Sequence, residues 1–169
     1  MSNFKEQIKE DIQLIQKDYG YIDDNLQRDE FAFNYWVLSR LYGMDEEIIA
    51  SNITDINDKG IDCFVHYEDT RELYLIQNKY YDEFTSVDRS DVADFLTTPL
   101  NVLLAGNYKR SEELQKIFDR IHKDSDYKIW LHFYVTNDLD NGDIENLINQ
   151  FSFNDEKIKA FVGVKYYKL

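Results

Sequence analysis

The chain has 169 residues but only one cysteine and one proline. The single cysteine, Cys63, excludes an internal disulfide framework, and its place in an apolar segment predicts a small buried hydrophobe. Six glycines and one proline leave no Gly- or Pro-rich linker at which the chain could be divided. With 43% hydrophobic and 15% aromatic residues, we expect one folded domain over residues 1–169.

Long apolar runs are also missing. No segment approaches the roughly 20 apolar residues that a membrane-spanning helix needs. No leader of charged, apolar and small residues opens the chain either. These absences argue against membrane insertion and secretion, and a cytoplasmic location is the default expectation.

Positive charge is scarce, because 19 Lys and Arg stand against 33 Asp and Glu, for a formal net charge of −14. A protein that grips a phosphate backbone ordinarily gathers Lys and Arg on its surface. The charge therefore opposes nucleic-acid binding unless local clusters compensate. The candidate clusters are Lys109-Arg110, Lys116, Arg120–Lys123 and the C-terminal Lys157, Lys159, Lys165 and Lys168.

Hydrophobic periodicity predicts alternating helices and strands. Helices are expected over about residues 3–19, from Asp24 or Asn25 to Leu41, and over 45–50, 88–104, 111–122 and 143–151, with a break or kink at Pro99. Strands are expected over 52–56, 60–67, 73–80, 128–136 and 160–167. Helices, a strand meander and then helix-strand-helix-strand predict an α/β fold.

Two neighbouring apolar segments carry polar side chains and are the most informative part of the chain. The segment Gly60–Val65 contains Asp62, and the segment Leu73–Tyr80 contains Gln77 and Lys79. The second segment has apolar residues on both faces, as expected of a strand buried between two layers. Gln and Lys are seldom buried, so their presence in such a strand indicates a functional role.

The geometry of strands indicates how these side chains would meet. Alternation places Gln77 and Lys79 on one side of their strand. Every second residue from Ile61 to Tyr67 is apolar or aromatic, apart from the small Cys63, which predicts one row on one face. A hairpin through residues 68–71 would bring the start of the first strand beside the end of the second. We therefore expect Asp62, Gln77 and Lys79 to converge.

These residues also have an ordinary structural explanation. Asp62 follows Lys59-Gly60 and could be a turn residue, and Lys79 at a strand end could reach solvent along its methylene stem. All three together, with two on one face of a buried strand, favour an active site. An intermediate interpretation is that the metal site is degenerate and the domain binds a partner without catalysis. The neutral side chain of Gln77 leaves this interpretation open.

The segment Gly60-Ile61-Asp62, a predicted hairpin and then Gln77-Asn78-Lys79-Tyr80-Tyr81 resemble the motif of the restriction-endonuclease-like nucleases. That motif is written PD-(D/E)xK, and this chain resembles its Mrr-like variant, in which Gln replaces the second acid. Within the superfamily, the chain is most similar to the N-terminal nuclease domain of AIPR (abortive infection phage resistance) proteins. The resemblance implies a three-layer α/β/α core with a central mixed sheet and extra N-terminal helices.

The resemblance further implies a metal-dependent nuclease that hydrolyses phosphodiester bonds, with DNA as the favoured nucleic acid, in phage defence or restriction. The implied cofactor is Mg²⁺ or Mn²⁺, a hard cation that takes oxygen ligands. Asp62 would be the main ligand, joined by the side-chain carbonyl of Gln77 and the backbone carbonyl of Asn78. Lys79 would orient or deprotonate the attacking water and stabilise charge on the phosphate.

Two further acids could supply the charge that Gln77 lacks. Asp58 lies in the loop before Asp62, and Glu30 lies in the helix before the sheet, where the resembling families often place another metal-binding acid. The alternative function is a catalytically inactive module of the same fold that binds a protein or nucleic acid. AIPR proteins are generally much longer than this chain, so a C-terminal domain beyond it and a homodimer are further expectations.

Overall fold

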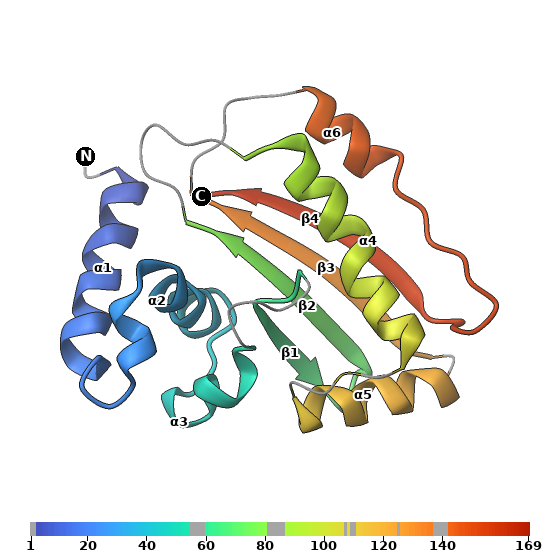
Figure 1. Cartoon of the computed structure of the whole chain (residues 1–169), viewed down its shortest axis with the longest axis horizontal. Helices are drawn as coiled ribbons and strands as arrows, with labels where there is room; N and C mark the ends of the chain where they lie inside the picture. Colours follow the sequence, from blue (N-terminus) through green and yellow to red (C-terminus); the bar gives the residue numbers. More distant parts are fainter. Residues whose placement is uncertain are drawn as a thin grey trace.

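The computed structural model describes residues 3–54, 60–80, 87–106, 108, 111–124, 126–136 and 142–169. They form a mixed α/β fold around a four-stranded sheet of order β1-β2-β3-β4 (Figure 1). The strands are β1 (Cys63–Tyr67), β2 (Glu72–Lys79), β3 (Lys128–Val135) and β4 (Phe161–Lys168). β1 is antiparallel to β2, whereas β2, β3 and β4 are parallel to one another.

The first predicted helix is confirmed as α1 (Phe4–Tyr19). Asn3 caps it, because its side chain accepts a hydrogen bond of 3.3 Å from the backbone N–H of Lys5. Ile8 and Ile12 lie one turn apart and are buried. This apolar stripe packs α1 against the helices that follow it.

The second predicted helix is divided into three pieces. These are the 3₁₀ helix η1 (Asp24–Gln27), α2 (Asp29–Trp36) and the π-helical η2 (Val37–Leu41). The predicted cap at Asp24 or Asn25 is wrong, because the side chain of Asp23 accepts a hydrogen bond from the Asn25 N–H. Extended backbone at Arg28, with ψ of 131°, separates η1 from α2.

The segment that leads into the sheet is only partly as predicted. The helical turn expected over 45–50 is present as α3 (Glu46–Ile49), followed by the 3₁₀ helix η3 (Ala50–Asn52). Of the strand expected over 52–56, Ile53 forms a single β-bridge to Cys63, and residues 55–59 lie outside the described part of the chain.

The remaining helices are α4 (Arg89–Ala105), α5 (Glu112–Lys123) and α6 (Gly142–Asn149). The sequence predicts a break or a kink at Pro99. The break is wrong, because α4 continues through the proline, and the kink stays a prediction. Phe95, Leu96 and Leu100 are buried against the sheet on both sides of Pro99. Their packing holds the helix together where the proline removes a backbone hydrogen bond.

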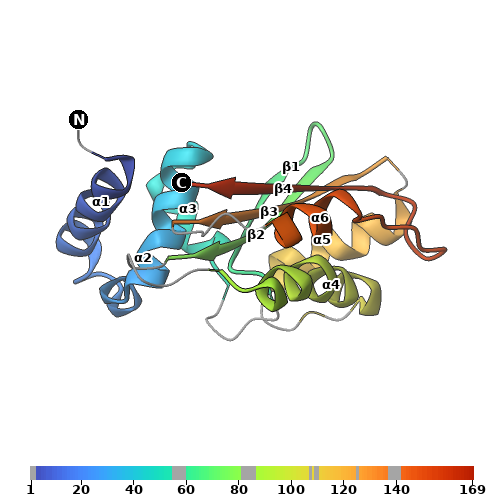
Figure 2. The same cartoon turned by 90° about the horizontal axis from the view of Figure 1, so that it is seen from above.

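The sheet lies between two hydrophobic clusters. Side chains of α4, α5 and α6 form one cluster with residues of the sheet, and side chains of α1, α2 and α3 form the other. Each cluster includes residues of all four strands. Figure 2 shows the N-terminal helices gathered at one end of the sheet. On β2, Leu75 joins the first cluster and Ile76 the second. Alternation therefore places Gln77 and Lys79 on the α4 side and Asn78 on the α2 side.

Candidate functional site

The hairpin predicted between the two motif segments is present. β1 and β2 pair with Cys63 opposite Ile76 and with Tyr67 opposite Glu72. The chain turns between the strands at residues 68–71. This register brings the start of β1 beside the end of β2, as the sequence predicts.

Asp62 lies one residue before β1, and its backbone is held from both sides. Its N–H donates to the carbonyl of Ile76 at 2.8 Å, and its own carbonyl accepts from the N–H of Thr54 at 2.9 Å. The Thr54 hydroxyl also donates to the Asp62 carbonyl, at 3.0 Å. The main chain of Asp62 is thus fixed beside β2, and its side chain is half-buried.

The predicted single row from Ile61 to Tyr67 is wrong. Ile61 belongs to the cluster under α4, whereas Cys63 and Val65 belong to the cluster under α2. The alternation of faces is therefore interrupted at Asp62, just before the regular strand begins. The interruption turns the Asp62 carboxylate toward the edge of β2.

The Asp62 carboxylate reaches the main chain of the neighbouring strand. Its Oδ2 atom accepts a hydrogen bond of 2.7 Å from the backbone N–H of Asn78. The regular pairing of β1 and β2 ends at Ile76, so the carboxylate stands in for a main-chain acceptor. In an extended strand, the N–H and C=O of one residue point to the same neighbouring strand. The Asn78 carbonyl therefore faces the same edge as the carboxylate.

Gln77 precedes this hydrogen bond and is half-buried on the α4 side of β2. Its side-chain Oε1 is buried and has no hydrogen-bond partner among the described residues. A buried amide oxygen without a partner costs about 1–3 kcal/mol, so it calls for a structural or functional reason. Such an oxygen is a suitable ligand for a hard cation.

Lys79 is the last residue of β2 and is half-buried. Its carbonyl accepts a hydrogen bond of 3.2 Å from the Thr136 N–H, which extends the contact between β2 and β3 beyond the strand end. In the described part of the chain, no acid forms a salt bridge with the Lys79 ammonium group. Lys79 and Gln77 share one face of β2 because they are two residues apart.

The side chain of Asn78 points to the opposite face, into a buried polar contact with α2. Its Nδ2 donates to Oδ1 of Asn34 at 2.9 Å and lies 3.5 Å from the sulfur of Cys63. Asn34 and Asn78 are 8% and 7% exposed. This amide pair joins the end of β2 to α2. Sequence reasoning did not single out Asn34, because the only available signal was one amide in an apolar helix.

Cys63 is confirmed as a buried residue. It is fully buried as a free thiol between the two strands and α2. Burial, and then the negative charge of Asp62, raises the pKa of the thiol well above its ordinary value. Burial therefore favours the protonated form of the thiol.

Of the two further acids predicted as metal ligands, the structure describes Glu30 but not Asp58. Glu30 is exposed in the first turn of α2 and lies four residues before Asn34, on the same helix face. Asn34 contacts Asn78, so this face of α2 is turned toward the end of β2. No salt bridge involving Glu30 is found among the described residues. Asp58 lies outside the described residues.

The donors that the structure brings together are mostly neutral. Among the described residues, no group of three or more His, Cys, Asp or Glu side chains is arranged to hold a metal ion. Among the described residues, the further oxygens close to Asp62 are therefore uncharged ones. Oε1 of Gln77, which lacks a partner, and the carbonyl of Asn78 fit that donor set.

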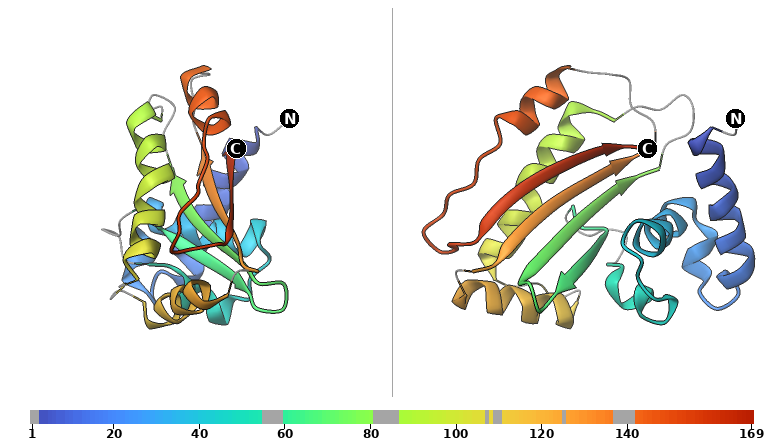
Figure 3. Two further views of the ribbon diagram at one scale, coloured as in Figure 1. Left: turned by 90° about the vertical axis from the view of Figure 1, so that its right-hand side faces the viewer. Right: turned by 180° about the vertical axis from the view of Figure 1, so that it is seen from behind.

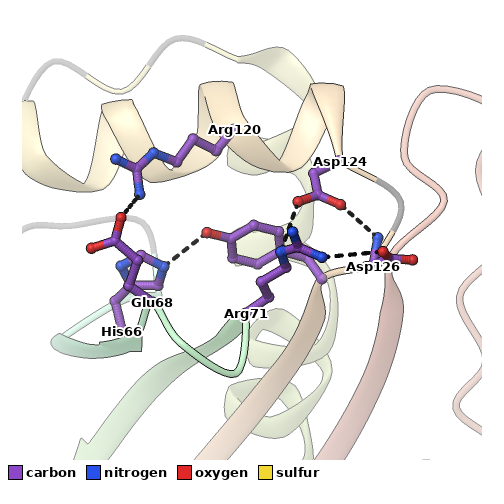
Figure 4. Close-up of polar contacts among 7 residues, drawn as sticks. His66, Glu68, Arg71, Arg120, Asp124 and Asp126 are labelled. Atoms are coloured by element: carbon purple, nitrogen blue, oxygen red, sulfur yellow. Dashed lines mark hydrogen bonds and ion pairs between the residues drawn. The ribbon is translucent and has the colours of Figure 1, made fainter.

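At the far end of β1 and β2, basic side chains are engaged in ion pairs (Figure 4). Arg120 of α5 lies 2.9 Å from Glu68 in the hairpin turn, and Arg71 lies 3.2 Å from both Asp124 and Asp126. Exposed pairs of this kind add little stability. They do neutralise the two arginines, so the predicted cluster that begins at Arg120 is opposed by neighbouring acids.

An apolar cavity of about 290 Å³ lies between η1, α2 and α3, apart from this site. It is lined by Tyr19, Ile22, Asp23, Leu26, Phe31, Tyr35, Glu46, Glu47, Ala50 and Ile53. Neither Asp62, Gln77 nor Lys79 contributes to its wall. A hydrogen bond to Glu46, and then burial, raises the pKa of Tyr19 to about 12.

No family model matches the chain, and no curated protein or solved structure matches it significantly. Among the described residues, no helix is both long and apolar enough to cross a membrane. The function is therefore argued from the site, because a fold by itself does not specify an activity.

Proposed function

We propose that this chain is a metal-dependent nuclease domain with a restriction-endonuclease-like fold, which hydrolyses phosphodiester bonds in nucleic acid. The observation that supports it most is the contact between the Asp62 carboxylate and the main chain of β2 at Asn78. Gln77 and Lys79 flank that residue. An acid beside a Gln-x-Lys strand is the arrangement expected of this superfamily.

The order of elements supports the same proposal. Helices precede an antiparallel pair, which is followed by two helices, a parallel strand, one helix and a further parallel strand. This is the order that the resemblance implies. The preference for DNA and the role in phage defence rest on the similarity to AIPR nuclease domains alone.

Each residue has a distinct part in the proposed reaction. The Asp62 carboxylate, Oε1 of Gln77 and the Asn78 carbonyl would hold Mg²⁺ or Mn²⁺. When bound, such a cation polarises the phosphate and lowers the pKa of a water molecule. The Asn78 N–H keeps the Asp62 carboxylate oriented toward the edge of β2. Lys79 places a fixed positive charge beside the phosphate and orients the attacking water.

The test is cleavage of plasmid DNA, single-stranded DNA and RNA in Mg²⁺ or Mn²⁺ by the wild type, Asp62→Ala and Lys79→Ala. Lys17→Ala removes an exposed lysine from the last turn of α1, outside the predicted basic clusters, and serves as the charge-matched control. We expect both site variants to lose cleavage and the control to retain it. Circular dichroism of each variant separates loss of activity from loss of folding. A wild type as inert as the variants, or site variants as active as the wild type, would reject the proposal.

A second candidate is a catalytically inactive module of the same fold that only binds its partner. The observation that favours it is that, among the described residues, the oxygens placed beside the Asp62 carboxylate are the neutral ones of Gln77 and Asn78. This candidate predicts nucleic-acid or protein binding by wild type and Asp62→Ala alike, without cleavage in either metal.

A further inference from the structure

The face of the sheet opposite Gln77 and Lys79 is only partly covered. Seen from behind, no helix of the described residues crosses β3 or β4, whereas α4 and α6 lie on their far side (Figure 3). Tyr42, which follows η2, covers the C-terminal part of this face through hydrogen bonds to His132 and Tyr134. Within the described part of the chain, no helix lies over the N-terminal halves of β3 and β4 on this face.

Strand register sorts the side chains of the open part into two rows across the sheet. The outer row is Tyr67, Glu72, Lys128 and Phe161, and the next row is Val65, Tyr74, Trp130 and Gly163. We call the four aromatic residues Tyr67, Tyr74, Trp130 and Phe161 the aromatic platform. Phe161 is 56% and Tyr67 43% exposed. The platform spans all four strands, a width of about 15 Å.

Gly163 makes the space that Trp130 occupies. A Cβ atom at position 163 would lie 2.4 Å from Cζ3 and 2.7 Å from Cε3 of Trp130. The indole therefore leans across β4 into the place where any other side chain would stand. Glycine in a strand interior often marks a place where another group approaches the backbone closely, and here that group is the indole of Trp130.

The aromatic rings of the platform are arranged in two edge-to-face pairs. Trp130 and Phe161 have ring centroids 5.5 Å apart and planes at 68°, and Tyr67 and Tyr74 have centroids 5.7 Å apart and planes at 86°. Such a pair uses one face of one ring and the edge of the other. It fixes the orientation of the rings and leaves other ring faces for a further flat group.

The charge of this face departs from that of the whole chain. The two rows contain Lys128 and Glu72, and the following row adds Lys165, which pairs with His132. Two lysines and one glutamate give these three rows a charge of +1, against −14 for the chain. Glu72 accepts a hydrogen bond of 2.8 Å from the Tyr74 hydroxyl. Lys128 and Lys165 are exposed, and neither forms a salt bridge within the described residues.

The charges also select one half of the platform. Asp69 lies in the turn next to Tyr67 and adds negative charge on the β1 side, whereas Glu68 in the same turn is paired with Arg120. The two lysines lie on β3 and β4, beside Trp130 and Phe161. An anionic chain would therefore run along β3 and β4.

We propose that this platform binds single-stranded nucleic acid, with unpaired bases stacked on Trp130 and Phe161 and the sugar-phosphate backbone beside Lys128 and Lys165. Exposed aromatic side chains on a sheet stack two or three bases in this way, and stacking tolerates any sequence. Duplex DNA binds more weakly because its bases already stack on one another. A second copy of the chain fits less well, since a two-fold contact brings each patch against its own equivalent and its own lysines.

The surface lies on the opposite face from Gln77 and Lys79 and needs no metal. Binding is therefore measured with the full chain in EDTA, by fluorescence anisotropy of labelled oligothymidine, oligouridine and a duplex. We expect the single strands to bind about tenfold or more tightly than the duplex. Quenching of Trp130 emission on binding, absent in Trp130→Phe, would report the stacking directly.

Substitutions then test the named residues. Phe161→Ala and Trp130→Ala should each weaken single-strand binding by about 5- to 150-fold, the range found for loss of one base-stacking aromatic. Phe161 is exposed, so its removal does not endanger folding. Tyr21→Ala is the matched control, because Tyr21 is 80% exposed and lies off the sheet. Lys165→Glu should weaken binding and reduce its dependence on salt.

Two results would overturn the proposal. One is that the wild type binds no single strand, or that Phe161→Ala and Trp130→Ala both bind single strands as tightly as the wild type does. The other is a wild-type dimer in sedimentation velocity that Phe161→Ala converts to monomer, which would assign the face to self-association. Neither result bears on the proposed nuclease activity, which is tested separately by cleavage and by Asp62→Ala.

Discussion

The backbone N–H of Asn78 lies 2.7 Å from the Asp62 carboxylate, beyond the point where the regular pairing of β1 and β2 ends. A carboxylate in the place of a main-chain carbonyl completes the hydrogen bonding of β2. It also keeps an anionic group at the open edge of the strand. Asp62 therefore has a stabilising role whether or not a cation binds, and the two roles can be measured apart.

The stabilising role is tested without metal. In EDTA, Asp62→Ala should lower the free energy of unfolding by about 1.5–3 kcal/mol, because the Asn78 N–H loses a charged acceptor. Asp62→Asn keeps a neutral acceptor and should cost less. Urea unfolding of both variants checks this order. If the alanine variant is as stable as the wild type, the hydrogen bond seen in the structure contributes nothing measurable.

The metal-binding role is tested at Gln77. Gln77→Glu places a carboxylate at the position of the unpartnered Oε1 and should tighten Mg²⁺ binding by about tenfold or more. Gln13→Glu adds the same charge at an exposed position of α1 and should leave Mg²⁺ affinity unchanged. Isothermal titration calorimetry compares the three proteins. Equal affinities for wild type and Gln77→Glu would exclude Gln77 as a ligand.

The sequence was sufficient where a short apolar run indicates a buried strand. Residues 73–80 are apolar on both faces, so β2 could be predicted, and the alternation of side chains along a strand then places Gln77 and Lys79 on one side. The interruption at Asp62 could not, because it depends on hydrogen bonds to Thr54 and Ile76 that alternation does not encode. The hairpin therefore predicted that Asp62 lies beside β2, but not that its carboxylate accepts a hydrogen bond from the Asn78 N–H.

Tertiary packing decided the other differences. Local propensity predicts a break at Pro99, but burial of Phe95 and Leu100 on either side of it keeps α4 continuous. Asn34 gave no spacing pattern, since a single amide in an apolar helix is recognised only by the partner it meets. That partner, Asn78, lies 44 residues away in the chain.

The contact between Asn34 and Asn78 provides the third prediction. Asn34→Ala should lower the free energy of unfolding by about 1–3 kcal/mol, because Nδ2 of Asn78 loses its oxygen acceptor in a buried place. Asn101→Ala removes an exposed amide from α4 and should change stability by no more than about 0.5 kcal/mol. Urea unfolding measures both.

A double-mutant cycle separates the contact from the loss of each side chain. Adding Asn78→Ala to Asn34→Ala should cost less than the sum of the two single substitutions, with a coupling energy of about 0.5–3 kcal/mol. Strict additivity would show that the two amides do not interact in solution.

The last prediction concerns His132, which is buried on the α2 side of β3. Burial, and then the charge of Lys165, lowers the pKa of His132 from 6.5 to about 4. Two tyrosine hydroxyls lie close to Nδ1 of the His132 ring, that of Tyr42 at 2.6 Å and that of Tyr134 at 3.4 Å. Burial raises the pKa of Tyr134 to about 12. The imidazole is therefore neutral in the folded protein at pH values where it is charged in the unfolded chain.

The sign of the pH dependence follows from proton binding. Between about pH 6.5 and pH 4, the unfolded chain holds more protons at His132 than the folded protein, so stability falls as the pH is lowered through this window. From pH 7 to pH 5, His132 should account for a loss of about 1–2 kcal/mol in the free energy of unfolding, allowing for its partial exposure.

His132→Phe tests this expectation, because phenylalanine cannot take up a proton. The variant also preserves the hydroxyl pair of Tyr42 and Tyr134, 2.7 Å apart. Urea unfolding at both pH values should show a smaller loss in this variant, while carboxylate titration affects both proteins alike. An equal loss in wild type and variant would mean that His132 titrates in the folded protein as freely as in the unfolded chain.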